Sequence, residues 1–151
     1  MRSRSPSVEQ RLRAPGRIPS GTRYTVPPDV LAALGRLFGR SEVDRIAVVY
    51  RPWYVHAHLM LIGARVGSVT RPERIYTNIA EDVFFALDRH VLHEYYHVVQ
   101  QWGRERMTRV GYLLSSARRE REAWDFVEAN LDLYRLSKRL LPERLRGREP
   151  R

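Results

Sequence analysis

The sequence predicts an α+β fold, with a small antiparallel sheet that contains a hairpin and packs against two long helices. Segments rich in β-branched residues and turn signals lie before residue 80, and two long helical patterns follow it. The two kinds of pattern do not alternate along the chain, which argues against a parallel α/β sheet. The length of 151 residues suffices for one domain with a core, and the absence of cysteine excludes disulfides.

Composition divides the chain into three parts. Residues 1–20 are rich in Arg, Ser, Pro and Gly, which predicts a disordered basic arm. Residues 21–140 form the predicted folded domain, and residues 141–151 form a basic tail. The net charge is +10. Such a surface can attract nucleic acid, but no aromatic-and-basic recognition motif accompanies it, so we favour a solvated surface and keep nucleic acid as a secondary expectation.

No segment has the features of a membrane span or of a secretory signal. No apolar run is long enough to cross a bilayer. The N-terminus is basic but lacks the apolar segment of a secretory signal. We therefore expect a cytoplasmic protein, or one exported by a route without such a signal, and no membrane partner.

The first half of the domain contains the predicted sheet. Asp29 can cap a short helix over residues 30–38, which Gly39 ends. Residues 44–50 have strand composition, and residues 53–61 fit either a short helix or an irregular link. Residues 64–70 and 74–78 then form a predicted hairpin, with Pro72 in the turn.

Two long helices follow the hairpin. The first begins either after a capping box of Asn78 and Glu81 or at a cap formed by Asp88, and Gly103 is expected to end it. Residues 104–111 read as a loop, and the second helix covers roughly residues 115–140.

The first of these helices carries the pattern His93-Glu94-x-x-His97. Residues four apart lie on one face of a helix, so His93 and His97 can offer two imidazoles to one metal ion. Glu94 lies about 100° round the helix and can reach a water on that ion. This geometry is typical of zinc hydrolases. Without cysteine, any metal must be held by histidine, carboxylate and water. The competing interpretation is a buried helix whose histidines only form hydrogen bonds.

Glu120 is the predicted third metal ligand. It is the one charged residue in a stripe at helical spacing, and a buried carboxylate must be paired or bound to a metal. That stripe consists of Ala117, Glu120, Trp124, Val127, Leu131 and Tyr134. A salt bridge with an arginine would also explain Glu120. Glu122 falls among arginines, where a solvated ion pair accounts for it.

Other groups are weaker candidates for the site. His90 is a rival ligand one turn before His93, although a supporting or surface role fits it better. Asp88 or Asp125 could orient a ligand histidine. His56 and His58 could bind metal if they lie on a strand, but packing or surface placement is the simpler interpretation.

The segment His93 to Gln101 resembles the HExxHVxQQ motif of bacterial zinc-peptidase domains. With the later Glu120-x-Glu122-Ala123, the chain is similar to gluzincin-like metallopeptidases of minimal size over about residues 44–134. In such families the first glutamate of E-x-E-A is the third ligand, which implies this role for Glu120. The resemblance also implies that a strand beside the metal-binding helix aligns a peptide, and the 64–78 hairpin would be that element.

The expected activity is therefore zinc-dependent hydrolysis of peptide bonds in a peptide or protein substrate. Glu94 would act as general base towards a zinc-activated water. The oxyanion needs a second electrophile, for which Tyr112 or an arginine is a candidate, while Tyr112 could equally be a core aromatic residue. The alternative is a binding module of the same fold with a structural or vestigial zinc and a basic surface for nucleic acid or protein.

Overall fold

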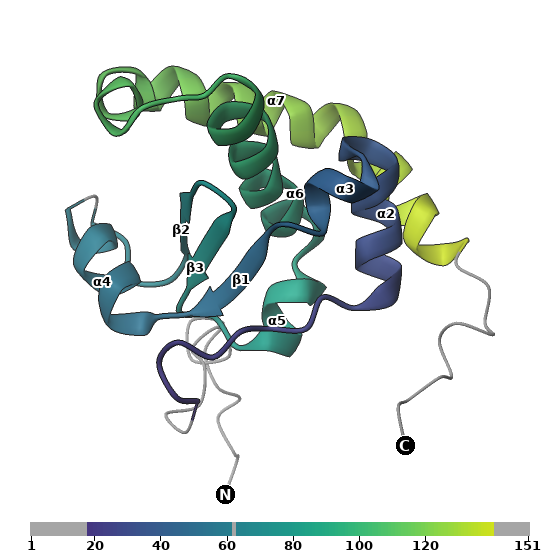
Figure 1. Ribbon diagram of the computed structural model, residues 1–151, viewed down its shortest axis with the longest axis horizontal. Coiled ribbons are helices and arrows are strands. Elements are labelled where there is room, and N and C mark those ends of the chain that lie inside the picture. Colours follow the sequence, from purple (N-terminus) through teal and green to yellow (C-terminus); the bar gives the residue numbers. More distant parts are fainter. Residues whose placement is uncertain (1–17, 62, 141–151) are drawn as a thin grey trace, which may run out of the picture.

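A computed structural model describes residues 18–61 and 63–140 (Figure 1). The predicted basic arm, apart from residues 18–20, and the predicted basic tail lie outside the described residues. Helices and strands follow one another in a mixed order that places the sheet before the long helices: α2 (Pro28–Phe38), α3 (Arg40–Val43), β1 (Ala47–Tyr50), α4 (Pro52–Met60), β2 (Ser68–Arg71), β3 (Arg74–Thr77), α5 (Glu81–Ala86), α6 (Asp88–Tyr96), the π-helix η1 (His97–Arg104) and α7 (Arg109–Arg139). The predicted α+β class is confirmed.

The sheet is mixed, which corrects the prediction of a purely antiparallel one. Its strand order is β1-β3-β2, and β3 pairs antiparallel with β2 through the predicted hairpin. β1, however, runs parallel to β3. A parallel pair requires a crossover between the two strands. The segment after β1 supplies it, because Pro52 starts the helix α4 where the sequence left the structure open.

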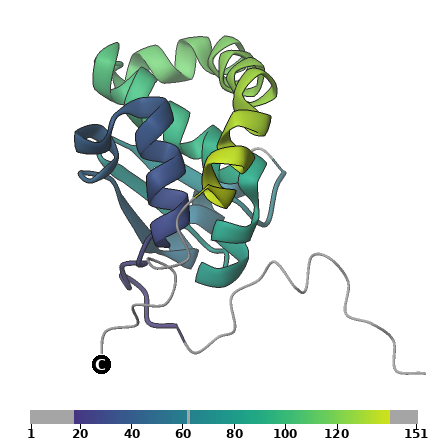
Figure 2. The same ribbon diagram turned by 90° about the vertical axis from the view of Figure 1, so that its right-hand side faces the viewer.

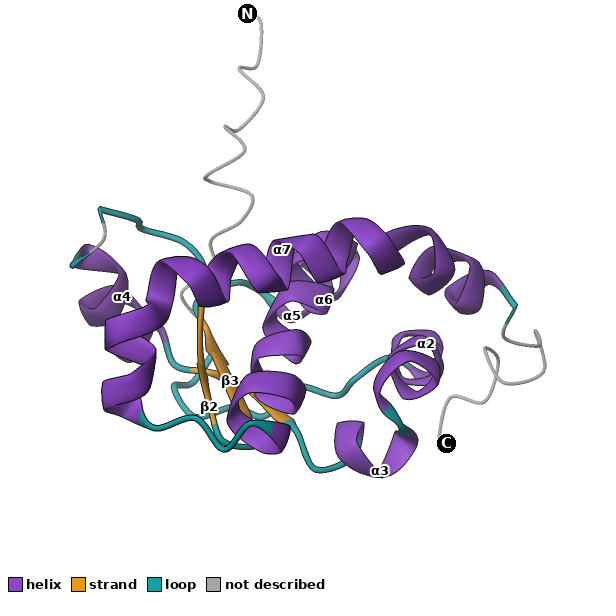
Figure 3. Cartoon of the chain, turned by 90° about the horizontal axis from the view of Figure 1, so that it is seen from above, coloured by secondary structure: helices purple, strands orange, loops and turns teal. Residues whose placement is uncertain are grey.

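The helices α6 and α7 form an antiparallel pair above the sheet. Asp88, at the start of α6, accepts hydrogen bonds from Arg135 and Lys138 near the end of α7. At the other end, Gln101 of η1 bonds to the backbone of Arg119. Figure 3 shows α7 crossing the molecule from the side of α4 to the side of α2. This pairing brings the middle of α7 over the HExxH segment.

One apolar cluster joins the helices to the inner face of the sheet. Its most deeply buried members come from α2, the strands, α5, α6 and α7, and include Leu34, Val48, Ile75, Phe84, Leu92, Tyr95, Val127 and Tyr134. Figure 2 shows α2 lying beside the last part of α7. The HExxH helix is therefore held on several sides by the core. None of the helices in the described ranges combines the length and apolar content that crossing a membrane requires.

Neither predicted cap of the first long helix forms. Asp88 is the first residue of α6 and accepts from Arg135 and Lys138, and the side chains of the predicted capping box bond elsewhere. Asn78 accepts from Gly67 N and donates to Arg65 O, so it braces the hairpin. Glu81 accepts from Thr25 N. The helical segment is also interrupted, because Leu87 has non-helical φ and ψ between α5 and α6. Asp29 likewise lies in the first turn of α2, and Pro27 occupies the cap position.

The HExxH helix continues as a π-helix and ends at Arg104, one residue after the predicted Gly103. The segment η1 begins at His97 and runs to Arg104. A Cβ atom at Gly103 would lie 3.3 Å from Val98 O, so a residue without a side chain suits this wide turn. π-Helical turns inside α-helices are frequent at functional sites. The loop before α7 is shorter than predicted because α7 already begins at Arg109, where Thr108 caps it by accepting from Gly111 N.

The buried stripe of α7 differs from the predicted one at three positions, one of which is Glu120, whose side chain is 42% exposed. Val127, Leu131 and Tyr134 are buried as expected, but Ala117 is exposed and Trp124 is 43% exposed. Ala123 occupies the buried position instead. Trp124 lies at the rim of the helix pair, where its ring covers His93 with centroids 4.3 Å apart.

Candidate metal centre

Three side chains converge where α7 crosses the HExxH segment. His93 Nε2 lies 2.9 Å from Glu120 Oε2, and His97 Nε2 lies 3.3 Å from Glu120 Oε1. The two histidine Nε2 atoms are 3.0 Å apart. One donor atom from each of these residues lies within 4.8 Å of the others, so the three could hold a metal ion. The structure thus brings together the three predicted ligands.

The spacing of these atoms suits a small tetrahedral ion. Two donors bound to one zinc ion at about 2.0–2.1 Å lie roughly 3.3 Å apart at a tetrahedral angle. The observed separations of 2.9, 3.0 and 3.3 Å, two of which involve different oxygens of Glu120, are close to that value. A set of two imidazoles and one carboxylate, leaving a fourth position for water, is also the donor set of catalytic zinc sites. The residues present therefore fit zinc.

Gln101 fixes which nitrogen of His97 faces the site. Its amide Nε2 donates to Arg119 O at 3.0 Å, so Oε1 is the end that lies 2.7 Å from His97 Nδ1. An amide oxygen only accepts, so Nδ1 must carry the hydrogen. In a neutral imidazole Nε2 then presents its lone pair to the centre. Gln101 is fully buried, which protects this arrangement from water.

His93 is held by packing. Its Nδ1 atom is buried and has no hydrogen-bond partner among the described residues, while the ring packs against the tilted ring of Trp124. The side chain is 7% exposed, compared with 3% for His97 and 42% for Glu120. Glu120 is thus less buried than predicted and lies at the open side of the site.

Without a metal, Glu120 and the two histidines form a hydrogen-bonded cluster. Burial alone would raise the pKa of Glu120, but hydrogen bonds from His93 and His97 outweigh it and hold that pKa far below its ordinary value. Burial alone would lower the pKa of His97, but the hydrogen bond to Glu120 and the charges of Glu94 and Glu120 raise it. The carboxylate is therefore already ionised, as metal ligation requires.

A cleft of about 150 Å³ opens onto the three converging side chains. Its wall combines the candidate ligands with Glu94, the strand β2, the end of α4 and Tyr112. Glu94 is buried, with one oxygen 3.6 Å from His90 Nδ1. Glu94 thus lies beside the ligands and faces the same cleft, as the spacing predicted.

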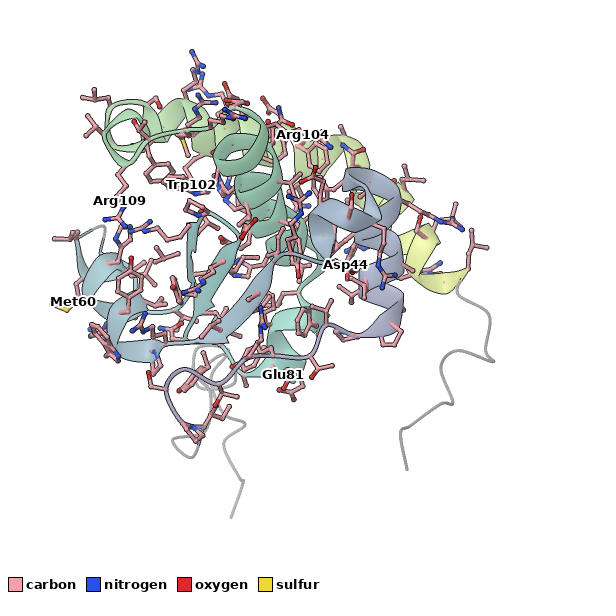
Figure 4. The ribbon with its side chains drawn as sticks, viewed as in Figure 1. Asp44, Met60, Glu81, Trp102, Arg104 and Arg109 are labelled. Atoms are coloured by element: carbon pink, nitrogen blue, oxygen red, sulfur yellow. The ribbon has the colours of Figure 1, made fainter. Side chains whose placement is uncertain are left out.

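Tyr112 reaches the site from the first turns of α7. Its hydroxyl donates to Glu120 Oε1 at 3.1 Å, and its ring stacks on Trp102 at 6.0 Å between centroids. Burial and the nearby charge of Glu120 raise the pKa of Tyr112, so its hydroxyl remains a proton donor. Figure 4 shows Trp102 near the strands and Arg109, at the start of α7, pointing towards the end of α4 that Met60 marks.

The weaker candidates lie outside the ligand cluster. His90 Nε2 bonds to Ser68 Oγ at 2.8 Å, which gives it a supporting position beside Glu94. Neither aspartate orients a ligand histidine in the described structure, because Asp88 binds Arg135 and Lys138, and Asp125 is exposed. His56 is exposed on α4, whereas His58 lines the cleft. Glu122 pairs with Arg118 and Arg119 as expected.

Sequence reasoning missed two contributors. Gln101 belongs to the polar stripe of the HExxH helix, four residues after His97, and that spacing could have identified it as the orienting group. Arg71 lines the cleft from the end of β2. No sequence signal indicated Arg71, because its position depends on how the hairpin packs. Comparison with protein-family models, curated proteins and solved structures found no match.

Proposed function

We propose that the protein is a zinc-dependent metallopeptidase. The observation that carries the proposal is the convergence of His93 Nε2, His97 Nε2 and the Glu120 carboxylate beside Glu94 in one cleft. Zinc fits the donor set and its spacing. A general base next to such a centre, in a cleft bordered by a strand, favours hydrolysis over a purely structural metal.

A bound zinc ion would supply Lewis acidity towards a water and a carbonyl oxygen. Glu94 would remove a proton from the attacking water and later deliver it to the leaving amine. Tyr112 would donate its hydroxyl to the developing oxyanion after leaving Glu120 Oε1. Gln101 would hold His97 in the tautomer that presents Nε2 to the ion. Each of these groups is buried or partly buried, where such interactions are strong.

The substrate would lie along β2. The strand order leaves β2 at one edge of the described sheet, and Ser68, Thr70 and Arg71 line the cleft. An extended peptide can add to a sheet edge through main-chain hydrogen bonds. A peptide added in this way would pass between the strand and the side chains of Glu94 and Tyr112, which supports a peptide bond as the target.

The proposal is tested by incubating purified protein, loaded with zinc, with denatured casein. We expect new peptide fragments, their loss in a metal chelator such as 1,10-phenanthroline, and their return when zinc is restored in excess. Cleavage that persists after the metal has been removed would contradict the proposal. Zinc binding without cleavage of casein or of a mixed peptide library would favour the alternative, a binding module with a structural or vestigial zinc.

A further inference from the structure

The outer face of the sheet carries a cluster of arginines and aromatic rings, of which only Arg71 also lines the cleft of the candidate metal centre. Paired residues in neighbouring strands lie on the same face. Arg23 pairs with Val49, and Val49 pairs with Tyr76 of β3. Arg74, two residues before Tyr76 and so on the same face, pairs with Arg71 of β2. These positions share the face that α4 covers only in part. We call the set of Arg23, Arg51, Trp53, Tyr54, Arg71, Arg74 and Tyr76 the arginine–aromatic face.

Cations and rings alternate across this face. The guanidinium of Arg51 lies 5.3 Å from the ring centroid of Trp53 and 5.5 Å from that of Tyr76. Arg71 lies 5.8 Å from the ring centroid of Tyr54, which in turn packs edge-on against Tyr76. These cation–π contacts orient the guanidinium groups. One N–H of Arg71 also donates to Thr70 O.

Part of the arginine–aromatic face is hollowed. A depression of about 440 Å³ is lined by Arg23, Arg51 and Arg74 together with the rings of Trp53 and Tyr76. No aspartate or glutamate is among the described residues that line it. None of these three arginines forms an ion pair within residues 18–61 and 63–140, whereas Arg118 and Arg119 on α7 do. Their charge is therefore available to an external anion.

Trp53 makes this surface more than a basic patch. Its side chain is 61% exposed, although burying an aromatic ring is normally favourable. A flat, exposed ring beside arginines can stack on a nucleobase while the guanidinium groups bind the phosphates. An acidic protein would need the arginines but would gain little from the exposed ring.

We propose that the arginine–aromatic face binds single-stranded nucleic acid, with a base stacked on Trp53 and phosphates bound by Arg23, Arg51 and Arg74. The surface lies on the opposite side of the sheet from the apolar core and does not depend on the peptidase proposal. The sequence contains no contiguous motif of this kind, because the residues of the arginine–aromatic face come from separated segments.

The test uses the full chain and a fluorescein-labelled thymidine oligonucleotide of about 12 nucleotides, within the site sizes of single-strand-binding folds. Fluorescence anisotropy is recorded between about 50 and about 200 mM salt, because phosphate contacts depend on salt. We expect Trp53→Ala to weaken binding at least about fivefold and Trp53→Tyr to restore most of it. Arg51→Gln should weaken binding and reduce the salt slope by about 0.7.

Matched controls separate this face from the general positive charge. Arg36→Gln removes an exposed arginine from α2, and Leu133→Ala removes a half-exposed apolar side chain from α7. Both should bind like the parent. Equal binding by Trp53→Ala and the parent, or no binding at the lower salt concentration, would overturn the proposal. The proposal would also be overturned if a glutamate oligomer of equal charge bound as tightly as the oligonucleotide and if Trp53→Ala weakened both equally.

Discussion

Gln101 Oε1 lies 2.7 Å from His97 Nδ1, and the same amide donates to Arg119 O, one residue before Glu120. One buried side chain thus orients the candidate ligand His97 and links its helix to α7, which carries the candidate ligand Glu120. Replacing Gln101 by leucine keeps a side chain of similar size in the buried space but removes both hydrogen bonds.

We expect Gln101→Leu to weaken zinc binding by about 10–100-fold, as is typical when the partner of a ligand histidine is lost. Competition with a chromophoric chelator measures the affinity. Gln101→Glu should retain part of it, because a carboxylate also accepts from Nδ1. Gln100→Leu is the control, since Gln100 bonds instead to Glu105 at the surface. A Gln101→Leu protein that is less stable but binds zinc normally would show that the residue acts only on folding.

Glu94 should be required for hydrolysis and dispensable for metal binding. Glu94→Gln keeps the size of the side chain but cannot accept a proton. We expect zinc content to equal that of the parent and the rate of casein cleavage to fall by at least about 100-fold. Metal analysis and the cleavage assay on the same preparation check both parts. Lost zinc would make Glu94 a ligand, and retained cleavage would remove it from the mechanism.

Tyr112 has two separable roles, a bond to Glu120 and donation to the oxyanion. Because the hydroxyl of Tyr112 is proposed to donate to the oxyanion, Tyr112→Phe should lower kcat by about 100-fold or more, with KM and zinc affinity little changed. The measurement is steady-state kinetics on a peptide substrate together with the chelator competition. Reduced zinc affinity at an unchanged kcat would assign Tyr112 to positioning Glu120 alone.

His90 should make the metal-free protein sensitive to acid. Burial lowers the pKa of His90, and the nearby His93 adds to this effect while the charge of Glu94 opposes it. As the pH falls below the ordinary value of 6.5, the unfolded chain protonates His90 before the native protein does. The free energy of unfolding therefore decreases with falling pH.

Urea unfolding in chelator at pH 7 and pH 5 measures this effect. We expect the loss of stability on acidification to be smaller in His90→Asn than in the parent. His56→Asn, which replaces an exposed histidine of α4, should behave like the parent. An unchanged loss in His90→Asn would contradict the assignment.

Local patterns predicted the parts of the fold that depend on local rules. The hairpin around Pro72 and the helical spacing of His93 and His97 follow from turn chemistry and from the 3.6-residue period, and the structure confirms both. The stripe argument selected Glu120 over Glu122, and the geometry agrees because only Glu120 contacts the histidines.

The errors arise where distant contacts compete with local signals. Asn78 and Glu81 form no capping box because Gly67 and Thr25 bind their side chains. The parallel pairing of β1 depends on the path of α4, which composition did not resolve. Likewise Arg23, Trp53 and Arg74 are separated along the chain, and only the fold brings them to one depression.

The most direct test of the metal centre is the zinc content of the purified protein, never exposed to chelator, compared with Glu120→Ala and Glu122→Ala. These variants remove neighbouring glutamates from the same helix, but only Glu120 lies at the histidines. We predict about one zinc per chain in the parent and in Glu122→Ala, and a loss in Glu120→Ala. No zinc in the parent even after zinc is added, or equal zinc in all three proteins, would contradict the proposed His93, His97 and Glu120 site.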